Sequence, residues 1–160
     1  MLAPSLARSQ GGYVNERFRF SARVPHSLTA CPHIPPAPDS GFIMPLSGQG
    51  CEGPLGGEYL AVAGWYNVPD HRNTQQAARD VCGDAMAHPA RAHRRIRFRR
   101  CDRHDEDGFA LVHYITLRLD PTPVWSLHGY VIVSSLRCRP ANCARYEPLL
   151  RNVVASIRFR

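Results

Sequence analysis

The most regular alternation of apolar and polar side chains lies near the start of the chain, over Tyr13–Val24. Its apolar positions are Phe18, Phe20, Ala22 and Val24, and the polar positions between them are Arg17, Arg19, Ser21 and Arg23. Strict period-two alternation is typical of a strand with one buried face. We therefore predict a single strand over residues 13–24, ended by Pro25.

Apolar patterns further along the chain predict the other elements. Strands are indicated over residues 58–66, 94–101, 109–119 and 125–138, with shorter ones near 41–46 and 156–160. A first helix begins at an Asn73 cap followed by Gln76 and runs at helical spacing to Met86, before Pro89 stops it. A second helix is predicted over 146–155, with Pro148 tolerated in its first turn.

The order of these elements predicts the fold class. Residues 25–57 are rich in proline and glycine, so they leave room for one short strand only. The remaining order is strands, helix, antiparallel meander and helix, which is typical of an α+β fold with an antiparallel β-sheet sandwiched with helices. A chain of 160 residues suits one domain. We place that domain at 13–160, after a flexible leader over 1–12.

Six cysteines occur, and none forms the Cys-x-x-Cys pair of zinc and redox sites. The simplest pairing joins neighbours, as Cys31–Cys51, Cys82–Cys101 and Cys138–Cys143. Pro140 and Asn142 favour a turn that brings the last pair within bridging reach. Such bridges imply an oxidising compartment. The alternative is a cytosolic protein with six buried, reduced thiols.

Charge and hydropathy limit which compartments and which classes of partner fit the sequence. All 20 basic residues are arginines, and the net charge is +7 with neutral histidines. Their spread from Arg8 to Arg160 favours an arginine-rich composition over a dedicated nucleic-acid surface. No apolar stretch reaches the roughly 18 residues that a membrane span needs. Small residues within Met1–Ala7 are similar to the end of a secretion signal, which predicts a mature periplasmic protein.

Two segments resemble bacterial PsbP-like domains. Tyr13–Pro25 is similar to their opening hairpin region, and Leu149–Phe159 is similar to their last helix and strand. The resemblance covers most of the chain in element order, and the insert at 25–57 departs from it. It implies a scaffold that binds proteins. The superfamily includes photosystem accessory subunits, secretion-effector chaperones, periplasmic lipoproteins and, among similar small secreted proteins, immunity factors against toxins delivered by type VI secretion.

The sequence offers little that is typical of catalysis. It has no Gly-x-Ser-x-Gly elbow, and His113 and His128 each share a strand face with apolar neighbours, as packed histidines do. The acidic run before Gly108 lacks the residues of a calcium loop, and no glycine-rich stretch has a phosphate-loop pattern. We therefore expect neither an enzyme nor a bound metal or cofactor.

Recognition surfaces are the remaining functional candidates. The first is the loop over 65–72, where we assign partner contacts to Trp65, Tyr66, Asp70, His71 and Arg72. Its companion is the acidic turn, with contacts assigned to Asp102, Asp105, Glu106 and Asp107. A third candidate is a basic sheet face made by Arg17, Arg19, Arg23, Arg95, Arg97 and Arg99. The alternatives are that Trp65 fills the core, that the turn only solubilises the protein, and that the arginine stems cover the sheet.

These expectations lead to one functional hypothesis with two alternatives. The leading hypothesis is a periplasmic immunity protein that plugs the active-site groove of a secreted toxin, a peptidoglycan amidase delivered by type VI secretion. The first alternative is a cell-envelope accessory factor or lipoprotein with no toxin partner. The second is a polyanion-binding module that uses the arginine face. A protein partner is expected in the first two cases, with a homodimer as a further assembly to consider.

Overall fold

The computed structural model describes residues 11–31, 38–46, 48, 50–51, 57–121 and 127–160. The strands are β1 (Tyr13–Asn15), β2 (Phe20–Ala22), β3 (Gly41–Pro45), β4 (Tyr59–Tyr66), β5 (His88–Ala90), β6 (Phe98–His104), β7 (Ala110–Pro121), β8 (His128–Cys138) and β9 (Arg158–Phe159). The helices are α1 (Thr74–Cys82), α2 (Cys143–Ser156) and a 3-10 helix over Pro38–Ser40. The leader predicted at 1–12 falls almost entirely outside the described residues.

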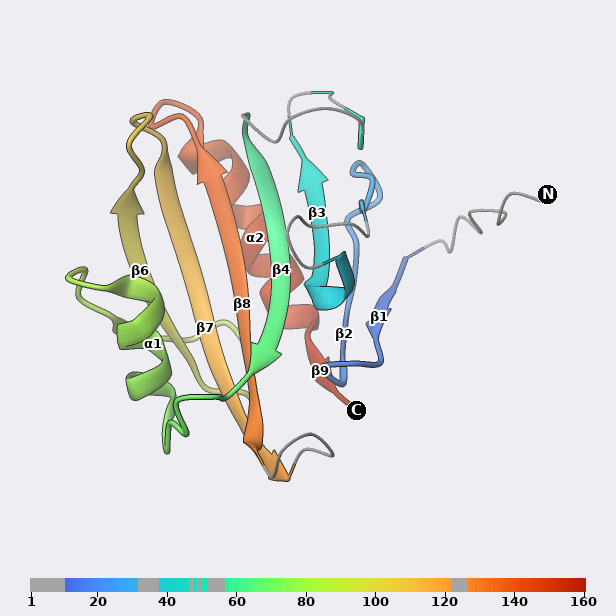
Figure 1. The fold of residues 1–160 in the computed structure, drawn as a ribbon. Coiled ribbons are helices and arrows are strands. Elements are labelled where there is room, and N and C mark those ends of the chain that lie inside the picture. The colour runs from blue at the N-terminus through green and yellow to red at the C-terminus, as the bar shows by residue number, and fades with distance from the viewer. Residues whose placement is uncertain (1–10, 32–37, 47, 49, 52–56, 122–126) are drawn as a thin grey trace.

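A six-stranded antiparallel sheet organises the molecule (Figure 1). Its strand order is β3-β4-β8-β7-β6-β5, and a smaller sheet has the order β1-β2-β9. The long strands β7 and β8 form the centre of the larger sheet. In their register, Val112 lies opposite Leu136 and Leu117 opposite Val131. With a helix on each face of this sheet, the expected α+β architecture is confirmed.

The main core lies between the large sheet and α2. The helix buries Leu150, Val153 and Val154, and the sheet contributes inward side chains such as Val62 and Ile132. Each such side chain contributes about 1.5–3 kcal/mol through burial. The β1–β2 hairpin and β9 close this core beside β3, because Phe18, Phe20 and Ile157 are buried in the same cluster.

The opposite face of the sheet is covered by the short helix α1. Ala77, Ala78 and Cys82 pack on a second cluster that includes Ile115 and Val131. Small alanines let the helix lie close to the strands. With only nine residues, α1 contacts β6 and β7, so it leaves the β4 end of this face without a helix (Figure 1).

The single strand predicted over 13–24 is wrong, since the segment forms the β1–β2 hairpin. Asn15 accepts a hydrogen bond from the backbone N–H of Phe18 at 2.8 Å, and Arg19 adopts a φ of +55°. A positive φ cannot continue a strand, so the chain turns there. The inward positions Phe18, Phe20 and Ala22 are buried as expected, since the alternation reports burial whether or not the chain reverses.

Helix boundaries also differ from the periodic pattern. The Asn73 cap is confirmed, because its side chain accepts from the N–H of Gln76 at 3.0 Å. The helix ends at Gly83, which has a φ of +57° and caps the Arg79 carbonyl, so Met86 lies outside it and is exposed. The second helix begins at Cys143, three residues earlier than predicted. Pro148 therefore lies in its second turn.

The strand predicted over 94–101 is displaced along the chain. Strand β6 begins at Phe98, while residues 91–97 form an irregular segment between β5 and β6. His93 holds this segment, because its Nδ1 lies 3.0 Å and 3.1 Å from the backbone nitrogens of Arg95 and Ile96. This local hydrogen bonding competes with a sheet ladder, which explains the later start of the strand.

All three expected disulfides are present, as Cys31–Cys51, Cys82–Cys101 and Cys138–Cys143. The second bridge fixes α1 to β6, and the third joins the end of β8 to the first residue of α2. No free cysteine occurs in the part of the chain described. Within the same residues, no helix is both long and apolar enough to cross a membrane.

Candidate functional site

Residues 65–72, which comprise the last two residues of β4 and most of the connection to α1, are called the aromatic loop. Its conformation depends on Asn67, which is fully buried. The Asn67 amide donates to the carbonyls of His71 and His128 at 2.9 and 2.8 Å, and its Oδ1 accepts from the His71 N–H at 2.9 Å. One side chain thereby fixes both ends of the turn and ties it to the start of β8. These hydrogen bonds of Asn67 make the loop rigid, and the sequence pattern did not predict them.

Charged side chains add a second layer of contacts to the aromatic loop. Asp70, which has a φ of +55°, lies 2.7 Å from the Arg72 guanidinium and 3.2 Å from Nδ1 of His128. His71 is directed inward, where its Nε2 lies 2.6 Å from Asp80 on α1. These exposed pairs contribute little to stability, typically about 0.2–1 kcal/mol each. Their effect is to orient the groups on the surface.

The two aromatic residues of the loop point in opposite directions. Trp65 is 40% exposed and lies on the α1 side, opposite Val131, which is itself opposite Leu117. Tyr66 lies on the other face, with its ring 5.1 Å from Phe18. Tyr66 therefore packs against the core, and Trp65 does not merely fill it. Val68 is 67% exposed and is the second exposed apolar side chain of the loop.

A cationic hollow adjoins this loop. It has a volume of about 870 Å³ and runs between the start of α1, the end of β7 and the segment before β6. Its apolar lining includes Leu117, Leu119 and Phe98. Among the described residues, its lining has six arginines and no carboxylate; the arginines are Arg72, Arg91, Arg94, Arg95, Arg97 and Arg99. We call this feature the arginine groove; Arg72 belongs to both the groove and the aromatic loop.

The basic sheet face expected from six arginines does not form. Arg17, Arg19 and Arg23 belong to the β1–β2 hairpin, which lies in the smaller sheet. Arg95 and Arg97 lie in the segment before β6 and instead line the arginine groove. Arg72, Arg91 and Arg94 were not expected to join them. The available signal was the run His88–Arg100, which contains no acidic residue.

The acidic turn, Asp102–Asp107, lies at the other end of the sheet from the aromatic loop. Tyr130 of β8 pairs with Tyr66, whereas Arg137 of β8 binds Asp105. Tyr130 and Arg137 are seven positions apart along β8, which corresponds to about 23 Å at the rise of a strand. The two surfaces predicted as companions are therefore not brought together.

Most carboxylates of the acidic turn already have partners within the protein. Arg137 lies 2.6 Å from Asp105 and 3.1 Å from Asp107, and its guanidinium covers the Phe109 ring at 3.6 Å. Desolvation raises the pKa of Asp105, but hydrogen bonds from Arg137 and from the Phe109 N–H outweigh it and lower that pKa.

The other two acidic residues of this segment are placed differently. Asp102 is bound by Arg100, whose Nε lies 3.1 Å from one carboxylate oxygen. Glu106 is exposed at the tip of the turn. The acidic turn is thus a neutralised hairpin end with one outward carboxylate.

One serine and histidine pair has the spacing of a catalytic dyad. Nδ1 of His113 lies 2.7 Å from Oγ of Ser135, across β7 and β8. Burial, followed by the charge of nearby Arg103, lowers the pKa of His113 to about 4, which makes it a weak base. Neighbouring backbone N–H groups on these central strands pair in the sheet ladder, so they cannot stabilise an oxyanion. The pair fits a packing role.

His128 differs from its expected packed state. It is the first residue of β8 and is exposed, beside Asp70. Gly129 follows it with a φ of +97°, which breaks the alternation that would have turned His128 inward. Within the described residues, no three His, Cys, Asp or Glu side chains are grouped to hold a metal.

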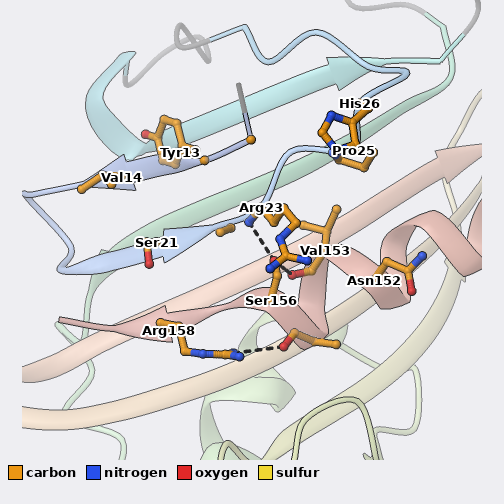
Figure 2. Close-up of a pocket in the computed structure, with 14 residues that line it drawn as sticks. Tyr13, Val14, Ser21, Arg23, Pro25, His26, Asn152, Val153, Ser156 and Arg158 are labelled. Atoms are coloured by element: carbon orange, nitrogen blue, oxygen red, sulfur yellow. Dashed lines mark hydrogen bonds between the residues drawn. The ribbon is translucent and has the colours of Figure 1, made fainter. Parts of the chain in front are cut away.

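A further hollow of about 720 Å³ lies between the β1–β2 hairpin and α2 (Figure 2). Ser156 accepts from the Arg23 N–H at 2.8 Å and donates to the Val153 carbonyl at 2.6 Å. Arg158 donates to the Ala155 carbonyl at 3.1 Å. These side chains serve the chain's own backbone, so the hollow offers a weaker ligand set than the arginine groove.

Comparison with known proteins identifies similar structures but no sequence family. No protein-family model matches the chain, and no curated protein sequence matches it. The crystal structure of the Saccharomyces cerevisiae Ran-binding protein Mog1p matches with a TM-score of 0.53 and 15% identity, covering 92% of this chain and 94% of Mog1p. The solution structure of cyanobacterial PsbP (CyanoP) from Synechocystis sp. PCC 6803 matches with a TM-score of 0.45 and 10% identity, covering 100% of this chain and 99% of CyanoP. The likeness to Mog1p shows a shared fold.

Proposed function

We propose that this protein is a binding module whose partner is another protein and whose primary contact is the aromatic loop. The observation that carries the proposal is that Trp65 and Val68 are exposed on a loop fixed from within by Asn67. Large apolar side chains held rigidly in water lose little conformational entropy on docking. Aromatic anchors of this kind commonly dominate binding energy.

The fold supports a protein partner by analogy. Mog1p, which has a similar fold, is described as Ran-binding. Folds host many functions, so this likeness supports a binding role in general and no particular partner. The surface itself supplies the more specific support, because Trp65 is exposed although the residue opposite it, Val131, is buried, and Val68 is exposed as well.

The disulfides support an extracytoplasmic location. Three bridges and no free cysteine among the described residues suit an oxidising compartment. We propose the periplasm.

The finer proposal is that the partner is a secreted toxin, a peptidoglycan amidase delivered by type VI secretion. The protein would act as an immunity factor that occludes the toxin's substrate groove, without turnover and without a cofactor. Support comes from the disulfide-fixed scaffold and the rigid loop, which suit steric plugging. The alternative is an envelope accessory factor, which would use the same loop on several partners.

Affinity capture from periplasmic extract tests the proposal. We would compare the wild type with Trp65→Ala and Val68→Asp, and use Met86→Asp, another exposed apolar position outside the loop, as the matched control. Retention of one partner by the wild type and the control, with loss in both loop variants and native circular dichroism, supports the proposal. Equal retention by all four proteins would overturn it.

The identity of the captured protein distinguishes the two finer readings. A single cell-wall hydrolase that the protein inhibits supports immunity. Several envelope proteins without inhibition support the accessory factor and contradict the toxin proposal.

A further inference from the structure

Beside the aromatic loop, the arginine groove concentrates positive charge, and among the described residues only Arg72 of its six arginines has an ion pair, to Asp70. Arg91, Arg94, Arg95 and Arg97 are exposed, and none has an ion pair among the residues that the structure describes. The Arg99 guanidinium donates to the amide oxygen of Gln75, at 3.1 Å, and has no ion pair with a described residue. This contrasts with Arg100, Arg118, Arg137 and Arg160, which all bind carboxylates.

The geometry of the segment keeps these cations close together. His93 fixes the turn by accepting backbone N–H groups, and Arg158 contacts Nε2 of the same imidazole at 2.6 Å. Burial and then the charges of Arg158 and Arg95 lower the pKa of His93. The segment is therefore fixed by an uncharged histidine at neutral pH. His93 thereby fixes the backbone from which the exposed side chains of Arg94, Arg95 and Arg97 extend.

We propose that the arginine groove binds an acidic, extended polypeptide segment of the partner. Guanidinium groups pair with carboxylates through charge-assisted, often bidentate hydrogen bonds. The apolar lining at Leu117 and Leu119 accommodates the side chains between the acidic ones. The positive end of α1 faces the same groove, since Asn73 and Thr74 line it. Arg72 makes the groove continuous with the aromatic loop.

The lining favours a polypeptide over a nucleic acid. Single-stranded nucleic acids bind through bases stacked on exposed aromatic rings. Among the described lining residues the aromatic rings are Phe98, which is buried, and His93, whose imidazole contacts the Arg95 and Ile96 backbone nitrogens and Arg158. Leu117 and Leu119 line the same groove and suit aliphatic side chains.

This inference rests on the proposed function, because it specifies part of the same protein partner. The probe is a short fluorescein-labelled peptide of alternating Asp and Leu, measured by fluorescence anisotropy on the full chain. A peptide with Asn in place of Asp controls for charge, and single-stranded oligothymidylate tests the nucleic-acid outcome. The groove variant is Arg94→Gln with Arg97→Gln. The matched control is Arg79→Gln with Arg151→Gln, which removes the same charge from exposed sites outside the groove.

The groove variant should weaken binding of the acidic peptide about tenfold or more, while the control variant stays near wild type. The Asn peptide should not bind measurably. Equal weakening in both variants would show that only the net charge of the protein matters, and it would overturn the proposal. Unchanged binding in the groove variant would overturn it as well. Tighter binding of oligothymidylate than of the acidic peptide would overturn it in favour of nucleic acid. Capture through Trp65 is measured separately, so the groove can fail while the proposed function stands.

Discussion

At the residue scale, Asn67 is the side chain on which the aromatic loop depends. It is one of six buried polar or charged residues that the structure describes, and it serves two carbonyls and one N–H. Buried polar groups must be satisfied, so the loop has few alternative conformations. The loop conformation that these hydrogen bonds fix thus buries Asn67 and leaves Trp65 exposed.

Replacing Asn67 by Ala should lower the free energy of unfolding by about 1–3 kcal/mol, because it leaves partly buried backbone groups without partners. Urea unfolding measures this change. Asn152→Ala, at an exposed position on α2, is the control and should stay within about 0.5 kcal/mol of wild type. Equal stability of the two variants would show that the loop does not need its internal hydrogen bonds.

His113 should make stability depend on pH in a defined window. Its pKa in the folded protein is about 4, below its ordinary value of 6.5, so the unfolded chain binds more protons between these values. The stability is therefore present above pH 6.5 and falls as the pH decreases towards 4. Between pH 7 and pH 5 the wild type should lose roughly 2 kcal/mol more than His113→Gln. Parallel pH profiles of the two proteins would contradict the buried, neutral state of this histidine.

At the element scale, the sequence predicted the long strands and both helices, but not where the chain reverses. Alternation over 13–24 indicates which side chains are buried. The same alternation occurs in one continuous strand and in a hairpin whose turn leaves every second side chain on the buried side. The turn at Asn15–Arg19 contains neither Gly nor Pro, and its one turn-forming residue, Asn15, is a weaker signal than the alternation around it. Gly83 is a residue type that often ends a helix, but the helical spacing of Ala85 and Met86 predicted that the helix continues past it.

The candidate site was predicted less completely than the fold. Residues 67–72 lie between β4 and the Asn73 helix cap, as the pattern predicts, whereas Trp65 and Tyr66 are the last residues of β4; partner binding there stays a prediction. The direction of Tyr66, the organising role of Asn67 and the assembly of the arginine groove depend on strand register and on contacts across the sheet. Neither can be obtained from the spacing of residues in one chain.

The disulfides act on elements, and their contributions should differ. Replacing Cys138 and Cys143 by Ala opens a loop with a sequence separation of 5, whereas replacing Cys82 and Cys101 opens one of 19. In the chain-entropy model the longer loop contributes about 1 kcal/mol more. Guanidinium unfolding of both double variants measures the difference. A larger loss for the short loop would show that packing between β8 and α2, and not loop closure, dominates.

At the scale of the whole molecule, charge is divided between the two ends of the sheet. The acidic turn is largely neutralised by Arg137, whereas five of the six groove arginines, all but Arg72, have no ion pair within the described residues. A partner with acidic groups is therefore attracted to the end that carries the aromatic loop. Attraction at that end speeds association, and the apolar anchors then limit dissociation. Part of the net charge of +7 is thus concentrated at the arginine groove, where it can attract an acidic partner.

Site-specific photocrosslinking tests the central claim, that the partner docks on the aromatic loop. A benzophenone side chain would replace Val68 in one protein and Val14, an equally apolar exposed position on β1, in another. Each protein would be irradiated in periplasmic extract and its adducts resolved by mass spectrometry. The account predicts one protein adduct at position 68 and none at position 14. An adduct at position 14 with none at 68 would contradict it and move the binding surface to the small sheet.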